Sequence, residues 1–295
     1  MVSPQAAPKL SIVILTMGNR PDEVTRAIES TGPLRAAGAE LIVVGNGTDP
    51  PPLPPDSGCT GLKLAENEGV TGGRNAGARA SSGDVVLFLD DDGWYPEPAA
   101  LGEHLTERFA ADPALAVLSF RVLDPDGGAG PRHYVPRLRV GDPGRSSVVT
   151  TFSGGACAIR RSAFGEAGGL PDRFFYAHEE TDLAWRLMAA GYRIEYDAAA
   201  TMCHPPVSNA RHSFWYRIEA RNRVWLARRN LPWPFAAIYL ADWMALTVLR
   251  ERSAGALKAW FSGFAEGWRT DPGKRQPISL GTVWRLTKAG RPPVI

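Results

Sequence analysis

The sequence DVVLFLDDDG, residues 84–93, joins a short apolar run directly to three consecutive carboxylates. The run from Val85 to Leu89 is rich in β-branched and aromatic residues, which is typical of a strand buried on both faces in a parallel sheet. Asp90, Asp91 and Asp92 then lie at the carboxyl end of that strand, where open α/β sheets bind ligands. Carboxylates brought together there repel one another unless a cation such as Mg²⁺ or Mn²⁺ binds them. The motif predicts either a metal-assisted nucleoside-diphosphate site or a solvated acidic turn.

Two earlier segments match the alternation of strands and helices found in α/β folds. The run from Leu10 to Thr16 predicts a buried strand, and Val24, Ala27 and Ile28 follow it at helical spacing. A further strand is predicted from Leu41 to Val44. Strand, helix and strand at this spacing indicate βαβ units and a parallel sheet.

A glycine-rich segment, NEGVTGGRNAGARAS at residues 67–81, comes before the acidic strand. Its pattern predicts a helix that ends near Gly83. The glycines around Arg74 and Asn75 either let the backbone approach a ligand closely or only terminate a loop.

The composition predicts a globular protein. With 295 residues, of which 44% are hydrophobic and 22% charged, the chain can form one large α/β domain or one domain with an appendage. We expect no secretory signal, because no apolar stretch follows a basic start. The three cysteines, Cys59, Cys157 and Cys203, lack metal-site spacing, so we expect free thiols in a reducing cytoplasm.

The segment from Asp124 to Arg145 is rich in Gly, Pro, Asp and Arg, which interrupt any regular period. A loop this long inside a domain is usually functional or disordered. It could carry contacts to an acceptor or act as a lid.

Charge is distributed unevenly along the chain. Residues 1–200 carry 18 Lys and Arg against 26 Asp and Glu, whereas residues 201–295 carry 15 against 5. The second segment also holds 13 aromatic residues, and basic and aromatic side chains together favour an anionic membrane surface. Nucleic acid is disfavoured as a partner, because no nucleic-acid motif accompanies the basic residues.

The stretch from Trp233 to Leu249 has about the minimum length for a spanning helix, but it contains Pro234 and Asp242. A charged carboxylate in mid-bilayer costs several kcal/mol, so spanning is disfavoured. An interfacial helix, a helix packed against the main domain, and an ordinary soluble helical subdomain remain open.

A second acidic cluster lies in HEETDLAWRL, where Glu179, Glu180 and Asp182 precede a helical run. Acids at a helix start are stabilised by its positive dipole end, which offers a purely structural explanation. Three acids within four residues are more than capping of a helix start requires. A carboxylate held beside a bound sugar could act as a general base on an acceptor hydroxyl.

The order of these motifs resembles the family 2 glycosyltransferases, inverting enzymes with the GT-A fold, and especially their rhamnosyltransferase-like members. The resemblance covers about residues 10–230 and implies an α/β fold: a nucleotide-sugar-binding, mostly parallel mixed sheet flanked by helices. It implies a catalytic domain at residues 1–211 and a helical, basic, aromatic-rich C-terminal appendage at residues 212–295. The segments that carry it are SIVILTMGNR, IVVGNGT, NEGVTGGRNAG, LFLDDD, SGGACAIRR, GGLPDRFFYAHEETDLAWRL and the Cys203, His204 pair.

The resemblance also implies site residues. The predicted donor-binding set is Thr16, Asn19 and Arg20 near the base, Asn67, Gly73, Arg74 and Asn75 along the base, ribose or diphosphate pocket, and Asn46, Asp90 and Asp91. The predicted metal ligands, for Mn²⁺ or Mg²⁺, are Asp92, Asp90 and His204. Glu180 falls at the position where the family has its catalytic base, and Glu179 and Asp182 lie beside it in the sequence.

This sequence departs from the family pattern in two places. Relatives commonly have an aspartate where this chain has Gly45, which puts base recognition in doubt. The base position holds Glu180 rather than Asp, and the longer side chain shifts the carboxylate by more than about 1 Å, so Asp182 remains a rival. Further on, RNRVW resembles the helix that bears Arg221 and Asn222 near the acceptor or diphosphate.

The function implied is metal-dependent transfer of one sugar, with inversion, from a nucleoside-diphosphate sugar to an acceptor hydroxyl. The acceptor could be a lipid-linked or polysaccharide cell-envelope glycan, or a natural product. We expect a cytoplasmic protein with peripheral membrane contact through the C-terminal region. Two alternatives stay open: a nucleotidyltransferase, which would use a nucleoside triphosphate, and a non-catalytic nucleotide-sugar-binding protein.

Overall fold

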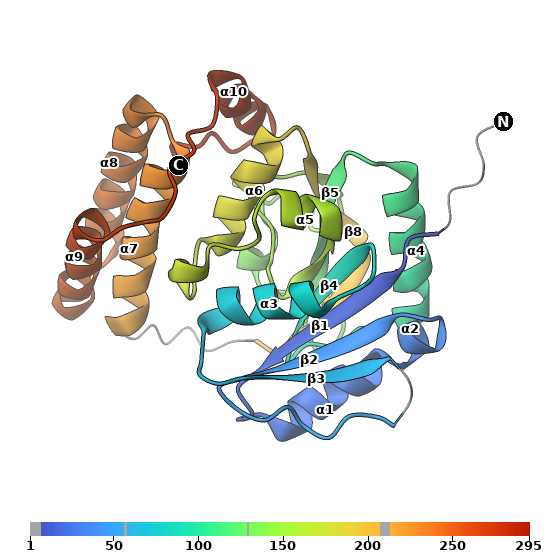
Figure 1. Cartoon of the computed structure of the whole chain (residues 1–295). Coiled ribbons are helices and arrows are strands. Elements are labelled where there is room, and N and C mark those ends of the chain that lie inside the picture. The colour runs from blue at the N-terminus through green and yellow to red at the C-terminus, as the bar shows by residue number, and fades with distance from the viewer. Residues whose placement is uncertain (1–6, 56–57, 129, 207–212) are drawn as a thin grey trace.

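An eight-stranded sheet runs through the protein and carries helices on both faces, within residues 7–55, 58–128, 130–206 and 213–295, which the computed structural model describes (Figure 1). The strands are β1 (Leu10–Thr16), β2 (Glu40–Asn46), β3 (Cys59–Leu64), β4 (Val85–Asp90), β5 (Leu115–Leu123), β6 (Ser147–Val148), β7 (Ala156–Arg160) and β8 (Arg193–Cys203). The helices are α1 (Pro21–Ser30), α2 (Gly32–Ala36), α3 (Gly69–Ala80), α4 (Pro98–Ala111), α5 (Arg161–Glu166), α6 (Glu179–Ala189), α7 (Ser213–Asn230), α8 (Trp233–Arg250), α9 (Ala254–Arg269) and α10 (Leu280–Lys288). Single 3₁₀ turns form at η1 (Arg132–Tyr134) and η2 (Asp172–Phe174).

The sheet order is β3-β2-β1-β4-β7-β5-β8-β6, and its first four strands are parallel. The antiparallel strand β7 lies between β4 and β5, which makes the sheet mixed. Leu15 pairs with Asp90, and Thr16 pairs with Gly45, so β1, β2 and β4 end at the same edge. The predicted mostly parallel mixed sheet is therefore confirmed, and Thr16, Asn46 and Asp90 meet at one rim.

The strands are buried on both faces, as their continuous apolar runs predict. Along β1, Ile12 and Ile14 face a core with α1, α2 and α4, whereas Val13 faces a second core with α3, α5 and α6. Val24, Ala27 and Ile28 are the buried positions of α1, in agreement with the helical spacing in the sequence. Helix α3 ends at Ala80, close to its predicted end.

The C-terminal helices extend the second core. Val224 and Leu226 of α7 are fully buried in the same cluster as Leu183 of α6, and α9 packs closely along α7. The expected domain boundary at 211/212 lies outside the described residues. None of the helices in the described part of the chain is both long and apolar enough to cross a bilayer.

Candidate active site

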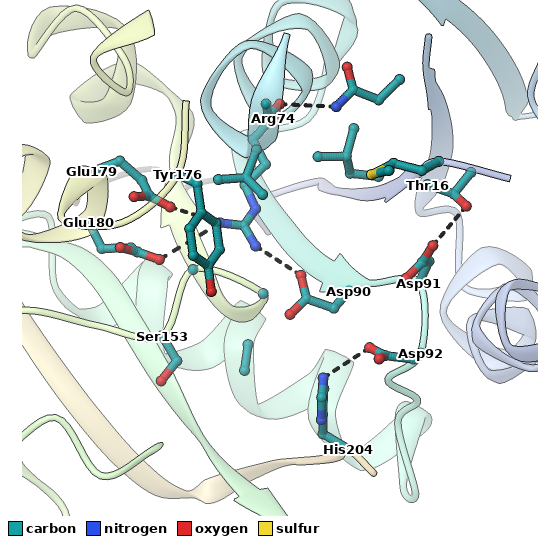
Figure 2. Close-up of a pocket in the computed structure, with 18 of the residues that line it drawn as sticks. Thr16, Arg74, Asp90, Asp91, Asp92, Ser153, Tyr176, Glu179, Glu180 and His204 are labelled. Atoms are coloured by element: carbon teal, nitrogen blue, oxygen red, sulfur yellow. Dashed lines mark hydrogen bonds and ion pairs between the residues drawn. The ribbon is translucent and has the colours of Figure 1, made fainter. Parts of the chain in front are cut away.

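A cavity of about 730 Å³ opens at the carboxyl rim of the sheet, between the strand ends, the start of α6 and the start of α7 (Figure 2). The sheet places the predicted donor and metal residues along one side, and α6 brings two acids to the other. The sequence-predicted residues that line it are Thr16, Asn19, Arg20, Asn46, Asn67, Arg74, Asp90, Asp91, Asp92, Glu179, Glu180 and His204.

The acidic turn after β4 is held by donors from β1, from the loop after it and from α1. The Thr16 hydroxyl donates to Asp91 at 2.8 Å, and the Arg20 guanidinium bonds to both Asp91 and Asp92. Arg26 donates to the Asp92 carbonyl at 3.1 Å. Burial raises the pKa of Asp91, which the Thr16 bond and the Arg20 charge only partly offset. Asp91 thus lines the cavity as an acceptor that Thr16 and Arg20 hold in place.

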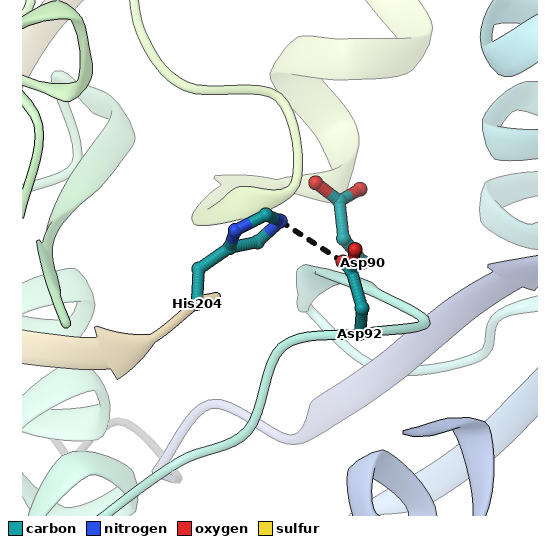
Figure 3. A group of neighbouring side chains, drawn as sticks. All are labelled: Asp90, Asp92 and His204. Atoms are coloured by element: carbon teal, nitrogen blue, oxygen red, sulfur yellow. Dashed lines mark ion pairs between the residues drawn. The ribbon is translucent and has the colours of Figure 1, made fainter. Parts of the chain in front are cut away.

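Asp90, Asp92 and His204 form a candidate metal centre, because one ligand atom from each lies within 4.8 Å of the others (Figure 3). A β-bridge between Trp94 and Cys203 joins the acidic turn to the end of β8 and brings His204 Nε2 to 2.9 Å from Asp92 Oδ1. The ring's Nδ1 lies 2.6 Å from the Pro205 carbonyl. That contact assigns Nδ1 as donor, so Nε2 can present a lone pair to a cation.

In this triad the pKa of Asp92 is lowered and the pKa of His204 is raised. Burial opposes the charged form of Asp92, but the hydrogen bond and charge of His204 and the charge of Arg20 hold its pKa below the usual range. Burial also opposes the charged form of His204, yet contact with Asp92 raises the pKa of its imidazole. Without a cation, the two groups therefore form an ion pair that a divalent ion would replace.

Arg74 connects the candidate metal centre to the acids of α6. Its guanidinium is buried, donates to Asp90 at 2.8 Å and lies 3.9 Å from Glu179 and 3.8 Å from Glu180. Burial lowers the pKa of Arg74, but the charges of Asp90, Glu180 and Glu179 outweigh this effect and raise it. A permanent positive charge therefore lies between the two groups of carboxylates.

Glycines at residues 154 and 155 make this approach possible. A Cβ on Gly155 would overlap the Asp90 carboxylate, and one on Gly154 would overlap Arg74 and Glu180. Any larger residue would push these charged groups apart. Gly154 and Gly155 of the SGGACAIRR segment thus line the site with backbone atoms only.

Asn46 and Asn67 close the cavity on the β2 side. The Asn46 amide donates to Asn67 Oδ1 at 2.8 Å, and its oxygen accepts from the Glu68 backbone at 2.9 Å. This chain has Gly45 where relatives commonly have an aspartate. The local structure explains the glycine, since a Cβ there would overlap the Thr48 carbonyl. The turn after β2 therefore excludes an aspartate side chain at this position.

Glu179 and Glu180 differ in their access to the cavity. The Glu180 side chain is 23% exposed, whereas that of Glu179 is 2% exposed, and its buried Oε2 has no hydrogen-bond partner among the described residues. Burial and the neighbouring Glu180 charge raise the pKa of Glu179 well above its usual range. Burial also raises the pKa of Glu180, against the opposing charge of Arg74. Two close carboxylates share protons, so Glu179 holds a proton more readily and Glu180 remains the accessible carboxylate.

The backbone before these acids is strained. Phe175, Ala177 and His178 all have positive φ angles of 65° to 73°, which are uncommon for residues other than glycine. The Asn222 amide of α7 donates to the carbonyls of Phe174, Tyr176 and Ala177 at 2.7–2.9 Å. One buried side chain thus holds the segment that delivers Glu179 and Glu180.

A second buried group on α7 lies beneath the same segment. Glu219 contacts His178 Nε2 at 3.3 Å, accepts from Trp260 at 3.2 Å and pairs with Arg223. Burial opposes its charged form, yet the Arg223 charge and the His178 bond keep the pKa of Glu219 far below its usual range. Charged Glu219 therefore anchors the residue that directly precedes α6.

The structure places several expected site residues outside the cavity. Gly73 faces Leu15 of β1, where any Cβ would overlap that side chain. Asn75 points away and donates to the Leu170 carbonyl at 2.8 Å and to Asp172 at 2.6 Å. These two residues pack α3 against its neighbours and do not line the cavity.

Arg221 and Asn222 also lie elsewhere than the resemblance implies. Arg221 donates to the Phe174 carbonyl at 3.1 Å, and Asn222 is fully buried against the same segment. Neither lines the cavity. Both donate instead to carbonyls of the backbone segment that precedes α6 and its acids.

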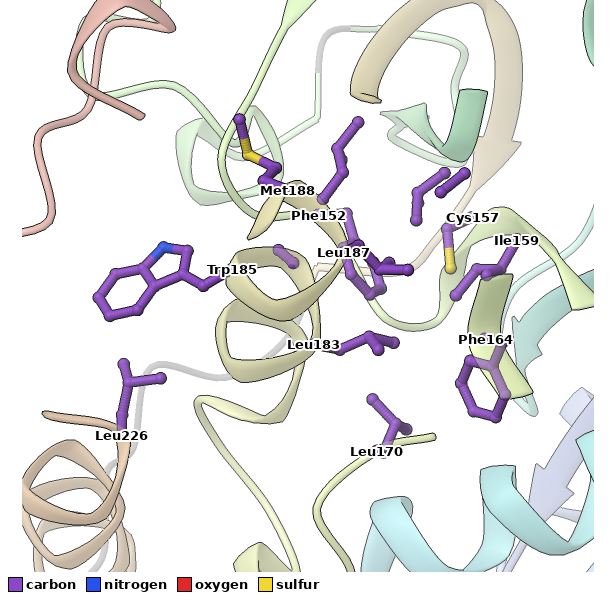
Figure 4. Close-up of a cluster of buried hydrophobic side chains, with 14 of the residues drawn as sticks. Phe152, Cys157, Ile159, Phe164, Leu170, Leu183, Trp185, Leu187, Met188 and Leu226 are labelled. Carbon is purple, nitrogen blue, oxygen red and sulfur yellow. The ribbon is translucent and has the colours of Figure 1, made fainter. Parts of the chain in front are cut away.

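Asp182, the rival base, is fully buried on the opposite side of α6. It bonds to Arg186 at 2.6 Å, to Arg229 at 2.8 Å and to Asn230 at 2.6 Å. The apolar residues Leu183 and Leu187 of the same helix belong to the buried core cluster (Figure 4). Asp182 therefore joins α6 to α7 and does not line the cavity.

We expect Asp182→Asn to destabilise the fold by about 3 kcal/mol, because it leaves buried cations without their partner. For a chain of this size that corresponds to a Tm lower by about 8 °C. Burial opposes the charged form, but the Arg186 and Arg229 charges hold the pKa of Asp182 below its usual range. Its stabilisation is thus complete above the unfolded-state pKa of about 4 and is lost as pH falls through the lower folded-state pKa.

Thermal unfolding between about pH 3 and pH 7 checks this prediction. The matched control is Asp271→Asn, which removes an exposed pair with Arg173 and should shift Tm by less than about 2 °C. A Tm deficit in Asp182→Asn that is absent near neutral pH, or that does not shrink in acid, would contradict the assignment.

Several residues of the cavity are not among the individually predicted site residues, although some lie in the quoted motifs or in the aromatic C-terminal segment. His133 and Tyr134 come from the long loop after β5, and Tyr134 lies 3.3 Å from His204 Nδ1. The loop's unusual length was the only indication. The remaining such residues are Phe152, Ser153, Phe175, Tyr176, Met202, Phe214, Trp215 and Ile218.

Known proteins resemble this chain in sequence and in fold. The family model for glycosyl transferase family 2 matches residues 11–168. A pre-mycofactocin glycosyltransferase of Mycobacterium tuberculosis is 29% identical over 212 residues, covering 68% of this chain and 41% of that protein. An N-acetylglucosaminyl-diphospho-decaprenol L-rhamnosyltransferase of the same organism is 33% identical over 104 residues, covering 28% of this chain and 33% of that protein. The chain thus spans less than half the length of either relative.

A solved structure extends the similarity to the fold. The mannosyltransferase PcManGT of Pyrobaculum calidifontis, in complex with GDP-Man and Mn²⁺, has a TM-score of 0.57 at 17% identity. The superposition covers 97% of this chain and 74% of that protein, so it includes the C-terminal helices as well as the sheet.

Proposed function

The chain belongs to glycosyl transferase family 2 and has the GT-A fold, and from this premise we propose that it transfers one sugar, with inversion, from a nucleoside-diphosphate sugar to an acceptor hydroxyl. One observation carries the proposal. The Asp90, Asp92 and His204 centre and the accessible Glu180 carboxylate face the same cavity, and Arg74 lies between them. A leaving diphosphate and an attacking hydroxyl need these two groups on opposite sides of one sugar carbon.

The donor would lie along the sheet rim. Asn46 and Asn67 offer amide groups near the end of β2, and Thr16, Arg20 and Asp91 follow along β1 and the acidic turn. Arg20, whose side chain is 43% exposed, can contact the diphosphate without losing its bond to Asp91. Arginine suits this position because its planar fork matches phosphate oxygens.

The metal would be Mn²⁺ or Mg²⁺, held by Asp90, Asp92 and His204. Two carboxylates and an imidazole suit such an ion, and the Pro205 carbonyl holds the His204 ring with Nε2 turned toward Asp92. When bound, the cation would act as a Lewis acid that stabilises negative charge on the departing diphosphate.

Glu180 would remove the acceptor proton. The acceptor oxygen forms its bond to the anomeric carbon, the bond from that carbon to the diphosphate breaks, and the proton passes to the Glu180 carboxylate. The raised pKa of Glu180 makes it a stronger base than an ordinary carboxylate. Attack on the face opposite the diphosphate inverts the anomeric centre.

The acceptor would enter between the α6 acids and the start of α7. Tyr134, Tyr176, Phe214 and Trp215 provide aromatic surface there, which suits the apolar faces of sugar rings. A lipid-linked or polysaccharide acceptor agrees with this surface and with the name of the rhamnosyltransferase relative. We place the reaction in the cytoplasm, in agreement with the free thiols of all three cysteines.

Thermal-shift measurements test the donor half of this proposal. The protein is heated with UDP, dTDP or GDP sugars, each with and without Mn²⁺, because a ligand that binds the native state raises Tm by mass action. A shift with one nucleotide family that requires the metal, followed by slow donor hydrolysis, is expected. No shift at ligand concentrations far above plausible dissociation constants would contradict an active transferase.

The role of Asn222 as a positioning residue yields a kinetic prediction. Asn222→Ala frees three carbonyls of the strained segment, so we expect kcat to fall about 10- to 100-fold while donor KM stays within about twofold. Asn230→Ala is the matched control, since it removes a buried asparagine from the same helix without touching residues 174–177. An equal loss of kcat in both variants would assign Asn222 a merely structural role.

A further inference from the structure

The solvent-facing half of α8 is almost entirely apolar. Large side chains there are exposed by 37–68%, a combination that is rare on the surface of a soluble protein unless it has a partner. The exposed apolar residues, which we call the α8 face, are Trp233, Pro234, Ala237, Ile238, Ala241, Met244, Ala245, Val248 and Leu249. They recur at helical spacing and so share one side of the helix.

The other half of α8 already packs against the protein. Ala236, Tyr239 and Leu240 are buried in the core shared with α6 and α7. Within the part of the chain that the structure describes, no other element therefore covers the α8 face. Its exposure costs free energy in water, which contact with an apolar medium would remove.

Cationic side chains lie at both ends of the α8 face. Arg250 and Arg252 are exposed at its C-terminal end and have no ion-pair partner among the described residues. At the other end, the Arg275 guanidinium lies 4.2 Å from the Trp233 ring centroid, and Lys274 beside it is exposed. Asp242 is the only acid of α8 and lies at the edge of the face. An apolar strip bounded by arginine, lysine and tryptophan matches an anionic lipid surface.

We propose that the α8 face docks this protein onto an anionic bilayer, with the helix axis in the plane of the membrane. The apolar side chains enter the headgroup boundary, and Arg250 and Arg252 contact lipid phosphates. A spanning arrangement does not apply, since no helix in the described ranges could cross a bilayer.

Docking would also orient the cavity. The Tyr216 hydroxyl of α7 donates to Glu251 at 2.6 Å, which joins the C-terminal end of α8 to the start of α7. Phe214 and Trp215 at that start line the cavity. The cavity would then lie beside the membrane, where a lipid-linked acceptor resides; only this step rests on the proposed function.

Vesicle flotation of the full chain tests the docking without donor, metal or turnover. We expect binding to vesicles of phosphatidylglycerol and phosphatidylcholine, and weaker binding to phosphatidylcholine alone. The variant I238D/V248D should bind at least about tenfold more weakly. The matched control L138D/V148D carries the same charge change at side chains that are 39% and 40% exposed elsewhere, and it should bind like the wild type.

Two further measurements define what would overturn the proposal. R250Q/R252Q should lose most of the preference for anionic vesicles and should mimic the effect of high salt. Equal binding by I238D/V248D and the wild type would overturn the proposal. So would wild-type dimers in sedimentation analysis that I238D/V248D dissociates while neither protein binds vesicles, because the face would then contact a second copy. Failure of transfer with intact vesicle binding would contradict only the proposed function.

Discussion

Replacing Glu180 with glutamine should lower kcat for glycosyl transfer by about 10³-fold and leave the donor Kd within about twofold. Glutamine has nearly the same shape as glutamate but cannot take a proton from the acceptor hydroxyl. Glu180 lies 3.8 Å from Arg74, which donates to Asp90 at 2.8 Å whether or not residue 180 is charged. Donor binding therefore survives the change, while the step that needs a base does not.

The choice of Glu180 over its neighbours follows from access. The Asp182 carboxylate is fully buried among cations on the α7 side, and the Glu179 side chain is only 2% exposed. Burial raises the pKa of Glu179 far enough that it is the acid more readily protonated of the two. Glu180, whose side chain is 23% exposed and lines the cavity, is therefore the carboxylate of this cluster that we expect an acceptor to reach.

Single-turnover transfer and calorimetric donor binding, measured on the same preparations, check this prediction. Glu179→Gln is the matched control, because it keeps the accessible base and should lose less than about tenfold in kcat. Since burial raises the pKa of Glu180, wild-type kcat/KM should fall with acid at a pH above the ordinary carboxylate range. Retained transfer in Glu180→Gln, together with its loss in Glu179→Gln, would move the base to Glu179.

The strands and the acidic turn could be predicted because their signals are local. Ile12 and Val13 face opposite cores, so a strand buried on both faces leaves an unbroken apolar run in the sequence. Asp90 ends such a run, and parallel pairing with β1 fixes which rim it occupies. Local patterns therefore predicted the sheet and the carboxylate side of the cavity.

Helix geometry alone could also have predicted that Glu180 and Asp182 face different sides of α6. Residues two positions apart on a helix lie on nearly opposite faces, so both could not point into one cavity. The sequence pattern alone did not say which face of α6 meets the cavity. That depends on Arg229 and Asn230 of α7, which bind Asp182 from a distant part of the chain.

The roles of Gly155 and Asn222 could not be predicted, because they depend on contacts between distant segments. Gly155 is required by the Asp90 carboxylate that lies against it, and no local periodicity records such an approach. Asn222 looked like a contact to substrate but holds the carbonyls of Phe174, Tyr176 and Ala177. Long-range polar contacts of this kind appear only once the helices are packed.

Asp92→Ala should abolish metal-dependent transfer, with a loss in kcat of about 10³-fold or more. Asp92 lies 2.9 Å from His204 Nε2 and joins two elements, the turn after β4 and the end of β8, into one ligand set. Its removal leaves Asp90 and His204 as a pair, which holds a hard cation poorly. Losing several kcal/mol of charge stabilisation on the leaving diphosphate corresponds to a rate loss of this size.

Binding of Mn²⁺ should be measured directly, by calorimetry with UDP, dTDP or GDP present, so that the result does not depend on turnover. Asp91→Asn is the matched control: it changes the adjacent carboxylate, which accepts from Thr16 at 2.8 Å and lies outside the triad. We expect Asp91→Asn to keep metal binding, whereas Asp92→Ala should bind Mn²⁺ at least about 100-fold more weakly.

Asp92 also pairs with Arg20, so its loss could alter the loop after β1. An unchanged Tm of Asp92→Ala would exclude that explanation. Metal binding that persists undiminished in Asp92→Ala would remove Asp92 from the proposed ligand set.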